Sequence, residues 1–408
     1  MTRVKRRRVL YIPGYDPFHP RRYRELYRRE GAEQARLSGY ALKQARGDGP
    51  YSWDVHAQID GCAVDTRIEV LVWSDIVSAS MSASIPATYW QMLRTAWIYI
   101  SSGALFRLMR LRKGPVIAAL YPIVFLIAQL LLAIVAGWSV ASLGRAAFDL
   151  LSFGQGAADP VSWGLGLVSG WALLRWFRAQ DNKVFAHYLM HDYAFSARWR
   201  GAYPDALETR MRAFADTVAE AIRSDADEVL VIGHSSGAHI AISVLADMLR
   251  AGRVPPGRCS LLTLGHVVPM VSFLSDAGRL RGDLHLMGGQ ESVPWVDVSA
   301  PGDGCAFALC DPVAVSGVAP AERRGPLILS AAFTRTLSPE RRAALRRRYF
   351  RLHFQYLCAF DALPGRVDDY DYFRITAGPM TLADRFATRG DSPSTLRDPV
   401  NRFTGMAA

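Results

Sequence analysis

The sequence predicts an α/β fold in which helices flank a mostly parallel sheet and an inserted transmembrane helical hairpin interrupts the chain. Short β-rich runs alternate with helical patterns over most of the 408 residues, as expected when helices join parallel strands. Two long apolar runs break this alternation near the middle of the chain. The length suits one large domain with an insertion better than a string of modules.

The expected strands are short runs of mainly apolar and β-branched residues. They span residues 8–12, 68–73, 228–232, 260–264, 295–299 and 327–330. Residues 205–223 and 236–250 have the periodicity of helices, and Ile240 and Val244 fall on one apolar face of the second. Residues 85–110 are rich in Trp, Tyr, Leu and Arg, which fits an interfacial helix, a lid or a helix packed on the surface.

Two apolar runs predict the transmembrane hairpin. Residues 115–138 carry no charge, and at about 1.5 Å per residue they can cross roughly 30 Å of hydrocarbon. Residues 161–177 are fewer and include Arg175, whose charged end would have to reach the interface. Glycines in this second run would let it pack closely against the first.

The charges that flank the two runs predict their orientation. The basic flanking residues are Arg107, Arg110, Arg112 and Lys113 before the first run, and Arg175, Arg178 and Lys183 at or after the end of the second. The connection holds Arg145 with two aspartates. By the positive-inside rule both ends of the hairpin face the cytoplasm. We therefore expect a multi-pass protein of the inner (cytoplasmic) membrane whose catalytic domain faces the cytoplasm.

This organisation divides the chain into four parts. Residues 1–84 form the N-terminal part of the core, residues 85–200 the inserted amphipathic segment and hairpin, and residues 201–389 the C-terminal part of the core. Residues 390–408 form a polar, turn-rich tail that we expect to be loosely ordered.

Basic residues outnumber acidic ones, 48 to 37, which gives a net charge of +11. They cluster at residues 3–8, 21–29, 107–113 and 341–348, and two of these clusters lie beside apolar segments. No recognised nucleic-acid-binding motif accompanies the charge. We therefore expect a lipid bilayer with an anionic surface as the partner, and no nucleic acid.

The five cysteines indicate a reducing environment. Their number is odd, and they form neither CxxC pairs nor a ligand spacing with histidine, which favours free thiols in a cytosol-facing domain. The N-terminal apolar run at residues 9–12 ends at Pro13 and Gly14, so it is too short for a signal peptide.

The sharpest chemical signal is the segment EVLVIGHSSG. A β-rich run ends in Gly233, His234, Ser235, Ser236 and Gly237, and a helical pattern begins at once. This is a GxSxG nucleophile elbow in its strand-turn-helix context, in which the serine is exposed on a tight turn above the sheet. The alternative is an ordinary strand-to-helix turn whose serine only caps the helix.

The segment VLVIGHSSGAHIA resembles the elbow of α/β-hydrolase-fold lipases and esterases, and the likeness extends in outline to RRVLYIPGYDP near the N-terminus. It covers residues 1–80 and 205–360, with the elbow as its one specific motif. The resemblance implies an α/β-hydrolase-like sheet and a Ser-His-Asp triad with Ser235 as nucleophile. It also implies an oxyanion hole built from the backbone N–H of Ser236 and that of Gly14 or Tyr15, although Pro13 and its neighbours replace the His-Gly-Gly pattern of lipases.

In this superfamily the acid follows the nucleophile and the histidine comes last. Asp303 lies on the loop after the predicted strand 295–299, where the acid of the family falls, and Asp311 is the alternative acid. Asp297 lies within the strand and is less suited. His353 is the one histidine that follows Asp303, so the resemblance implies that it is the base.

The other histidines fit structural roles better. His239 lies on the helix after the elbow, and His266 and His285 precede Asp303. His187 and His191 are four residues apart and would share a helix face, as metal ligands do, but there is no HExxH motif and no evident third ligand. We expect neither a metal nor a cofactor.

Together these features predict a membrane-anchored serine hydrolase that cleaves an ester or thioester of a lipid-like acyl substrate through an acyl-enzyme. Two alternatives stay open. One is a non-catalytic membrane scaffold with an α/β-hydrolase fold. The other is an acyltransferase that passes the same acyl group to an acceptor other than water.

Overall fold

The computed structural model describes residues 3–81, 84–150 and 155–407, and these form two compact units. The first unit comprises Met1–Ser78, Tyr99–Val116 and Trp199–Ala408, and the second Ala79–Ile98 and Ile117–Arg198. The second unit shares most of its residues with the expected insertion at 85–200. Residues 99–116 differ, because they belong to the first unit.

An eight-stranded sheet forms the centre of the first unit, in the order β2-β3-β4-β1-β5-β6-β7-β8. The strands are β1 (Arg6–Ile12), β2 (Ala41–Arg46), β3 (Ser52–Ile59), β4 (Cys62–Val70), β5 (Glu228–His234), β6 (Cys259–Leu264), β7 (Trp295–Ser299) and β8 (Leu327–Ser330). From β4 to β8 every pair is parallel, whereas β2, β3 and β4 form an antiparallel meander.

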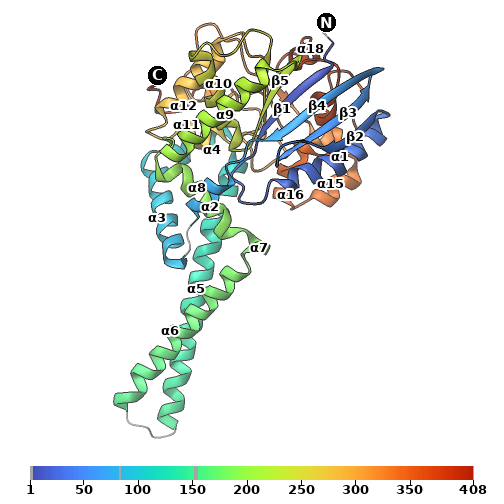
Figure 1. Ribbon diagram of the computed structural model, residues 1–408. Coiled ribbons are helices and arrows are strands. Elements are labelled where there is room, and N and C mark those ends of the chain that lie inside the picture. Colours follow the sequence, from blue (N-terminus) through green and yellow to red (C-terminus); the bar gives the residue numbers. More distant parts are fainter. Residues whose placement is uncertain (1–2, 82–83, 151–154, 408) are drawn as a thin grey trace. The chain divides into compact units, whose positions relative to one another are not determined.

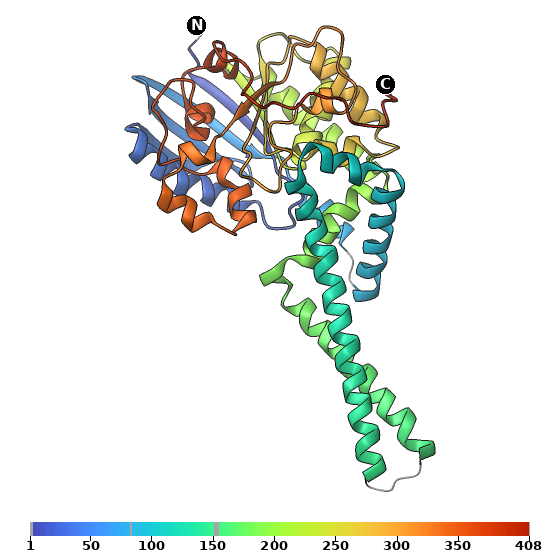
Figure 2. The ribbon, with the colours of Figure 1, turned by 180° about the vertical axis from the view of Figure 1, so that it is seen from behind.

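Helices cover both faces of this sheet (Figures 1 and 2). Those of the first unit are α1 (Arg21–Ser38), α4 (Ala104–Leu111), α9 (Asp205–Arg223), α10 (Gly237–Arg250), α11 (Val268–Ser272), α12 (Gly278–Gly289), α13 (Pro312–Val315), α14 (Phe333–Thr336), α15 (Pro339–Leu345), α16 (Tyr349–His353), α17 (Tyr372–Ala377) and α18 (Leu382–Phe386). The predicted α/β class with a mostly parallel, helix-flanked sheet is therefore confirmed.

The central strands are rich in apolar residues because both of their faces are buried. Successive side chains of a strand point to opposite faces, so Val9 and Tyr11 enter one core while Leu10 and Ile12 enter the other. The first core holds aromatic residues of α1 and α17, among them Tyr27 and Phe373. Helices α9 and α10 pack on the strand β5.

Most predicted elements of this unit are present. Strands β7 and β8 and helix α9 have the predicted bounds, and α10 begins one residue later than predicted. The strand predicted at 68–73 is instead β4, which starts at Cys62 and ends at Val70. Strands β2 and β3 were missed. The reason for β2 is that it is a half-exposed edge strand without an apolar alternation.

The described part of the tail, residues 390–407, is held to the rest of its unit by backbone hydrogen bonds. Ser392 N–H donates to the carbonyl of Ile328 at 2.8 Å, and Leu396 N–H donates to that of Leu309 at 2.7 Å. Near the end, Ala407 N–H donates to the carbonyl of Gly278. Polar composition misled the prediction because these contacts are made by backbone groups, which every sequence carries.

The second unit is helical. It contains α5 (Lys113–Leu150) from Ile117 on, most of α3 (Ile85–Ser101), α6 (Gln155–Ala179), α7 (Asp181–Val184) and α8 (Ala186–Arg198), with α2 (Ser74–Ser80) at the boundary of the units. Helices α5 and α6 pack backbone to backbone: a Cβ atom at Gly137 would lie 2.7 Å from the carbonyl oxygen of Gly166. The predicted close packing of these two helices through glycine is thus present.

Among the described helices, α5 alone is long and apolar enough to cross a membrane, with a mean hydropathy of 2.5 over 18 residues. Length and composition are the whole basis of this finding. Helix α6 falls short because glycine, serine and tryptophan lower the mean hydropathy of its apolar run. The structure therefore supports one candidate span, and the predicted pair of spans is not supported.

Candidate active site

Ser235 occupies a sharp turn between β5 and α10. Its φ is +57°, a left-handed conformation that L-residues rarely adopt and that recurs where a turn exposes a functional side chain. The flanking glycines allow this turn. A Cβ atom at Gly233 would lie 2.7 Å from Cα of Ala238, and one at Gly237 would lie 2.2 Å from the carbonyl oxygen of Ile12. The GxSxG spacing is therefore required by packing at this position.

Replacing Gly237 by alanine is expected to lower the free energy of unfolding by about 1–3 kcal/mol, since the new methyl group would overlap the backbone at the end of β1. Chemical denaturation of the two proteins measures the difference. The matched control is Gly390→Ala, where no atom lies within 4 Å of the added methyl group. Equal losses of stability in the two variants would contradict the packing argument.

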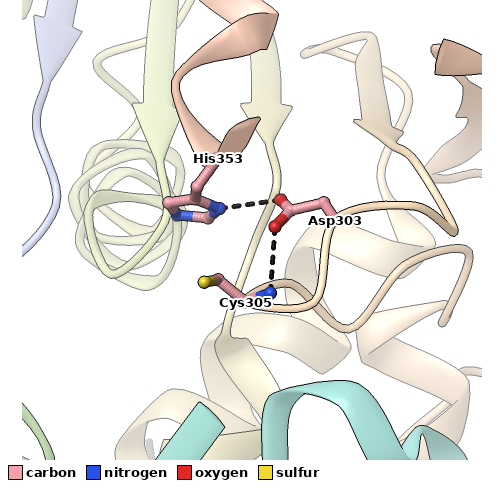
Figure 3. Close-up of side chains that lie close together, drawn as sticks. All are labelled: Asp303, Cys305 and His353. Atoms are coloured by element: carbon pink, nitrogen blue, oxygen red, sulfur yellow. Dashed lines mark hydrogen bonds and ion pairs between the residues drawn. The ribbon is translucent and has the colours of Figure 1, made fainter. Parts of the chain in front are cut away.

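His353 and Asp303 form a buried pair. Nδ1 of His353 lies 2.7 Å from Oδ2 of Asp303 (Figure 3). The same carboxylate accepts hydrogen bonds from the hydroxyl of Tyr356 at 3.0 Å and from the backbone N–H of Cys305 at 2.9 Å. Asp303 follows β7 on a loop, and His353 ends α16. An aspartate held in this way fixes the orientation and tautomer of the imidazole and leaves Nε2 for proton transfer.

The pair lies beside the serine turn. The ring of His234, the residue before Ser235, packs on the ring of His353 with centroids 4.8 Å apart, and its Nε2 donates to the carbonyl of His353 at 3.0 Å. Burial and the neighbouring His353 hold the pKa of His234 well below its ordinary value. His234 is thus a neutral donor that ties α16 to the turn. In the described structure no hydrogen bond joins Ser235 to His353 itself.

The loop after β1 lies against Ser235. A Cβ atom at Gly14 would lie 2.9 Å from Cβ of Ser235 and 3.4 Å from its Oγ, so the backbone approaches the serine as closely as glycine allows. The indole N–H of Trp73 donates to the carbonyl of Pro13 at 2.9 Å and fixes this loop. The Tyr15 ring is buried and packs edge-on against Trp73.

Two of the predicted oxyanion donors are backbone N–H groups without an acceptor among the described residues. In the described part of the chain, the backbone N–H groups of Gly14 and Ser236 have no hydrogen-bond acceptor. Ser236 directly precedes α10, where N–H groups are unpaired and the helix dipole favours negative charge. These two groups are therefore available to a developing oxyanion. For Tyr15, whose backbone N–H was the alternative to that of Gly14, the structure describes the ring, which is buried against Trp73.

Asp311, the alternative acid, has a structural role. It caps α13 by accepting hydrogen bonds from the N–H groups of Val313 and Ala314. Its other oxygen pairs with Arg323 at 2.7 Å and lies 3.6 Å from Arg397. A carboxylate engaged by a helix terminus and two guanidinium groups has no capacity left to orient an imidazole.

The other three histidines that follow Ser235 before His353 are held by other groups. His266 Nε2 donates to the carbonyl of Cys310 at 3.0 Å, and His285 Nδ1 donates to that of Val318 at 2.9 Å. His239 packs on the ring of Tyr203, with centroids 5.5 Å apart. None of these side chains contacts the Asp303–His353 pair in the described structure.

The buried ring of His239 gives a pH dependence to stability. Burial lowers its pKa to about 3, whereas an unfolded chain protonates histidine near its ordinary pKa of 6.5. Its contribution is fully present above that value and is lost as the pH falls toward 3, at about 1.4 kcal/mol per pH unit. Denaturant unfolding at pH 7, 6 and 5 should therefore show His239→Asn losing stability less steeply than the unaltered protein. His56→Asn, at an exposed site, is the control, and parallel slopes for His239→Asn would contradict the prediction.

His187 and His191 lie on α8 in the second unit, one turn apart as expected. Both are buried, and neither Nδ1 has a hydrogen-bond partner among the described atoms. Burial and the neighbouring His187 lower the pKa of His191 to about 4. The described residues place no third ligand near the two rings, because the single group of three potential ligands lies elsewhere.

That group consists of Asp303, Cys305 and His353, whose ligand atoms lie within 4.8 Å of one another (Figure 3). Its chemistry would suit a thiophilic divalent ion. However, the short contact between Asp303 and His353 and the donors from Tyr356 and Cys305 already use the carboxylate. The arrangement therefore fits a hydrogen-bonded acid–base pair better than a metal centre.

Sequence reasoning missed one residue of this site, Tyr356, and did not foresee that His234 packs on His353. Tyr356 bridges the loop of the acid, since its hydroxyl donates to Asp303 and accepts from the N–H of Ala300 at 3.0 Å. Burial and Asp303 raise its pKa well above the ordinary value, so it stays a donor. The one signal in the sequence that could have indicated Tyr356 is its position three residues after His353.

No protein family, curated protein or solved structure matches this chain. The functional argument therefore rests on the geometry of the site. That geometry comprises a serine on a strained strand-to-helix turn, a buried acid–base pair beside it and two unpaired backbone donors.

Proposed function

We propose that this chain is a membrane-anchored serine hydrolase of the α/β-hydrolase type that cleaves an ester or thioester bond. One observation carries the proposal: the Asp303–His353 pair packs on His234, and the next residue is a serine that a left-handed turn places at the end of a central parallel strand. Ligands of open α/β sheets bind at the carboxyl ends of the strands, and Ser235 and Asp303 both follow such ends.

Each residue has a definite part in the proposed reaction. Ser235 Oγ attacks the acyl carbonyl while His353 Nε2 accepts its proton, and Asp303 stabilises the imidazolium that forms. The N–H groups of Ser236 and Gly14 stabilise the oxyanion. The leaving alcohol or thiol takes the proton from His353, and water then releases the acid from the acyl-enzyme. The proton transfer from Ser235 requires Nε2 of His353 to approach Oγ of Ser235. Such a contact often tightens only when substrate is bound.

Purified full-length protein in a neutral detergent should hydrolyse p-nitrophenyl esters of a graded series of chain lengths. Absence of turnover with every chain length would favour the non-catalytic scaffold. Adding a primary alcohol separates hydrolysis from acyl transfer, because an acyltransferase would yield the new ester as its main product. A hydrolase would continue to release the free acid.

The membrane attachment is proposed to be a hairpin of α5 and α6. Large apolar side chains are exposed on both helices, and they include Val124, Leu131, Leu132, Ile134, Val135, Trp138 and Leu143 on α5 and Val161, Leu165, Leu167, Val168 and Trp171 on α6. So much exposed apolar surface is unusual in water and is suited to lipid. Close packing through Gly137 and Gly166 would hold the two helices together.

The topology has its own test. In cells, a reporter that is active only outside the cytoplasm should give a signal when inserted between residues 151 and 154, and no signal when fused after residue 408. The basic residues that flank the helices predict this orientation. A cytoplasmic location of both reporters would exclude the hairpin and leave surface attachment of the chain.

A further inference from the structure

A groove with apolar walls and an arginine rim lies between α1 on one side and α15 and α16 on the other. Helix α1 lies beside α15 and α16 in both views (Figures 1 and 2). The groove has a volume of about 710 Å³, which is the size of a small-molecule site. Its apolar lining includes Leu26, Leu345, Phe350 and Phe354. We call this feature the arginine groove.

The charge of the groove is positive. Arg22, Arg29, Arg341 and Arg351 line it, against the two carboxylates of Glu25 and Glu30. Glu30 already pairs with Arg29 at 3.0 Å and with Arg341 at 3.2 Å. It also accepts a hydrogen bond from the backbone N–H of Ala359. In the described structure Arg351 is exposed and has no ion pair, so an anion in the groove would meet an unpaired guanidinium.

The helices that form the groove and the segment between α15 and α16 carry further exposed arginines. They are Arg21 and Arg28 on α1, Arg342 on α15, and Arg346, Arg347 and Arg348 between α15 and α16. A surface of this kind raises the local concentration of anions and accelerates their binding. Guanidinium groups match phosphate in particular, because their N–H donors fit two phosphate oxygens at once.

The groove shares its elements with the candidate active site. Helix α16 carries Arg351 at the groove and His353 at the acid–base pair. Phe354 lines the groove, and its ring also packs on that of His234 with centroids 5.2 Å apart. The guanidinium group of Arg22 also lies over the Phe354 ring, 5.0 Å from its centroid.

A second connection runs through the loop after β1. Arg22 pairs with Asp16 at 2.6 Å, two residues beyond Gly14. Tyr23, which lines the groove, also donates to Asp16. A ligand in the groove would therefore contact the elements that hold His353 and the proposed oxyanion loop.

We propose that the arginine groove binds an anionic amphiphile, with a phosphate group at Arg351 and Arg341 and a hydrocarbon chain along Phe350 and Phe354. This inference rests on the proposed function in one respect: it makes the substrate of Ser235 an acyl ester that carries a phosphate. The binding itself is independent of catalysis. The shared chemistry is a phosphate attached to an apolar chain, supplied either by a free molecule or by the headgroup of a bilayer lipid.

Binding is tested with the full-length Ser235→Ala protein, which cannot turn over substrate. Isothermal titration with dodecyl phosphate should show saturable binding, and inorganic phosphate alone should bind at least about tenfold more weakly because it lacks the chain. Arg351→Gln should weaken dodecyl phosphate binding by about tenfold, as expected for the loss of a charge-assisted contact. Arg212→Gln, on the exposed side of α9, is the matched control and should leave binding unchanged.

A second variant protects the test from a folding artefact. Ala344→Trp fills the groove with an aromatic side chain at an exposed position and should abolish binding without loss of stability. Vesicles distinguish the two sources of the phosphate. Selective binding to vesicles with phosphatidic acid over phosphatidylcholine, reduced by Arg351→Gln, assigns the groove to a bilayer headgroup, and binding of dodecyl phosphate alone assigns it to a free ligand.

Two results would overturn the inference: no binding of either phosphate-bearing probe, or binding that neither Arg351→Gln nor Ala344→Trp alters. The proposed function fails separately. If dodecyl phosphate binds and no ester is hydrolysed, the groove is a binding site without the proposed chemistry. If neutral esters are hydrolysed and the probes do not bind, Ser235 is the nucleophile of a different substrate class.

Discussion

Replacing Ser235 by alanine is expected to lower the turnover of p-nitrophenyl esters by at least about 10⁴-fold while the protein stays folded. Removing the nucleophile of a triad leaves only the contributions of the oxyanion hole and of binding. Steady-state kinetics of purified protein, together with thermal unfolding, separate loss of chemistry from loss of structure.

Two variants serve as controls for this result. Ser236→Ala removes a hydroxyl but keeps the backbone N–H that the proposed oxyanion hole uses, so it should retain most activity. Cys305→Ser tests the thiol near His353 as a rival nucleophile. Activity that survives Ser235→Ala and disappears in Cys305→Ser would transfer the nucleophile to the thiol.

The second large effect is expected at the acid. Asp303→Asn should lower kcat by about 10⁴-fold, because the amide that replaces the carboxylate favours the wrong tautomer of His353. KM should change little, since Asp303 is buried behind the histidine.

The matched comparison is Asp311→Asn. This change removes the charge that pairs with Arg323 and weakens the cap of α13, so it should lower the free energy of unfolding by about 1–3 kcal/mol. Its kcat should remain near that of the unaltered protein under conditions where it is folded. The reverse pattern, with kcat lost in Asp311→Asn and kept in Asp303→Asn, would exchange the roles of the two aspartates.

The sharp turn at Ser235 could be predicted from sequence because its requirements are local. Gly233 and Gly237 lie two residues on either side of Ser235, and the packing that excludes their side chains follows from a strand meeting a helix. The parallel part of the sheet was equally accessible, since strands buried on both faces are continuous apolar runs. The strand β2, at the edge of the sheet, and its neighbour β3 lack this signal.

A different signal could have revealed the edge of the sheet. Strands β3 and β4 are joined by Asp60 and Gly61, both with positive φ, and Asp-Gly is the preferred pair for such a hairpin turn. Asp311 carries a second local signal. It stands directly before Pro312, which is the pattern of a helix N-cap followed by proline in the first turn. Both features can be recognised in the sequence alone.

Other parts of the site could not be predicted because they depend on contacts between distant segments. The packing of His234 on His353 joins β5 to α16 across 119 residues. Similarly, the arginine groove exists because α1 lies beside α15, and the ion pair of Glu30 with Arg341 joins them across 311 residues. The sequence showed two separate basic clusters and gave no reason to place them together.

The most direct test of the central claim is the location of a covalent adduct. A fluorophosphonate probe should label the purified full-length protein with one adduct per chain, and peptide mass spectrometry should place that adduct on Ser235. His353→Gln should slow the labelling severely, because the serine would lose its base. Absence of labelling, or an adduct on another residue that persists in Ser235→Ala, would contradict the assignment of this protein as a serine hydrolase acting through Ser235.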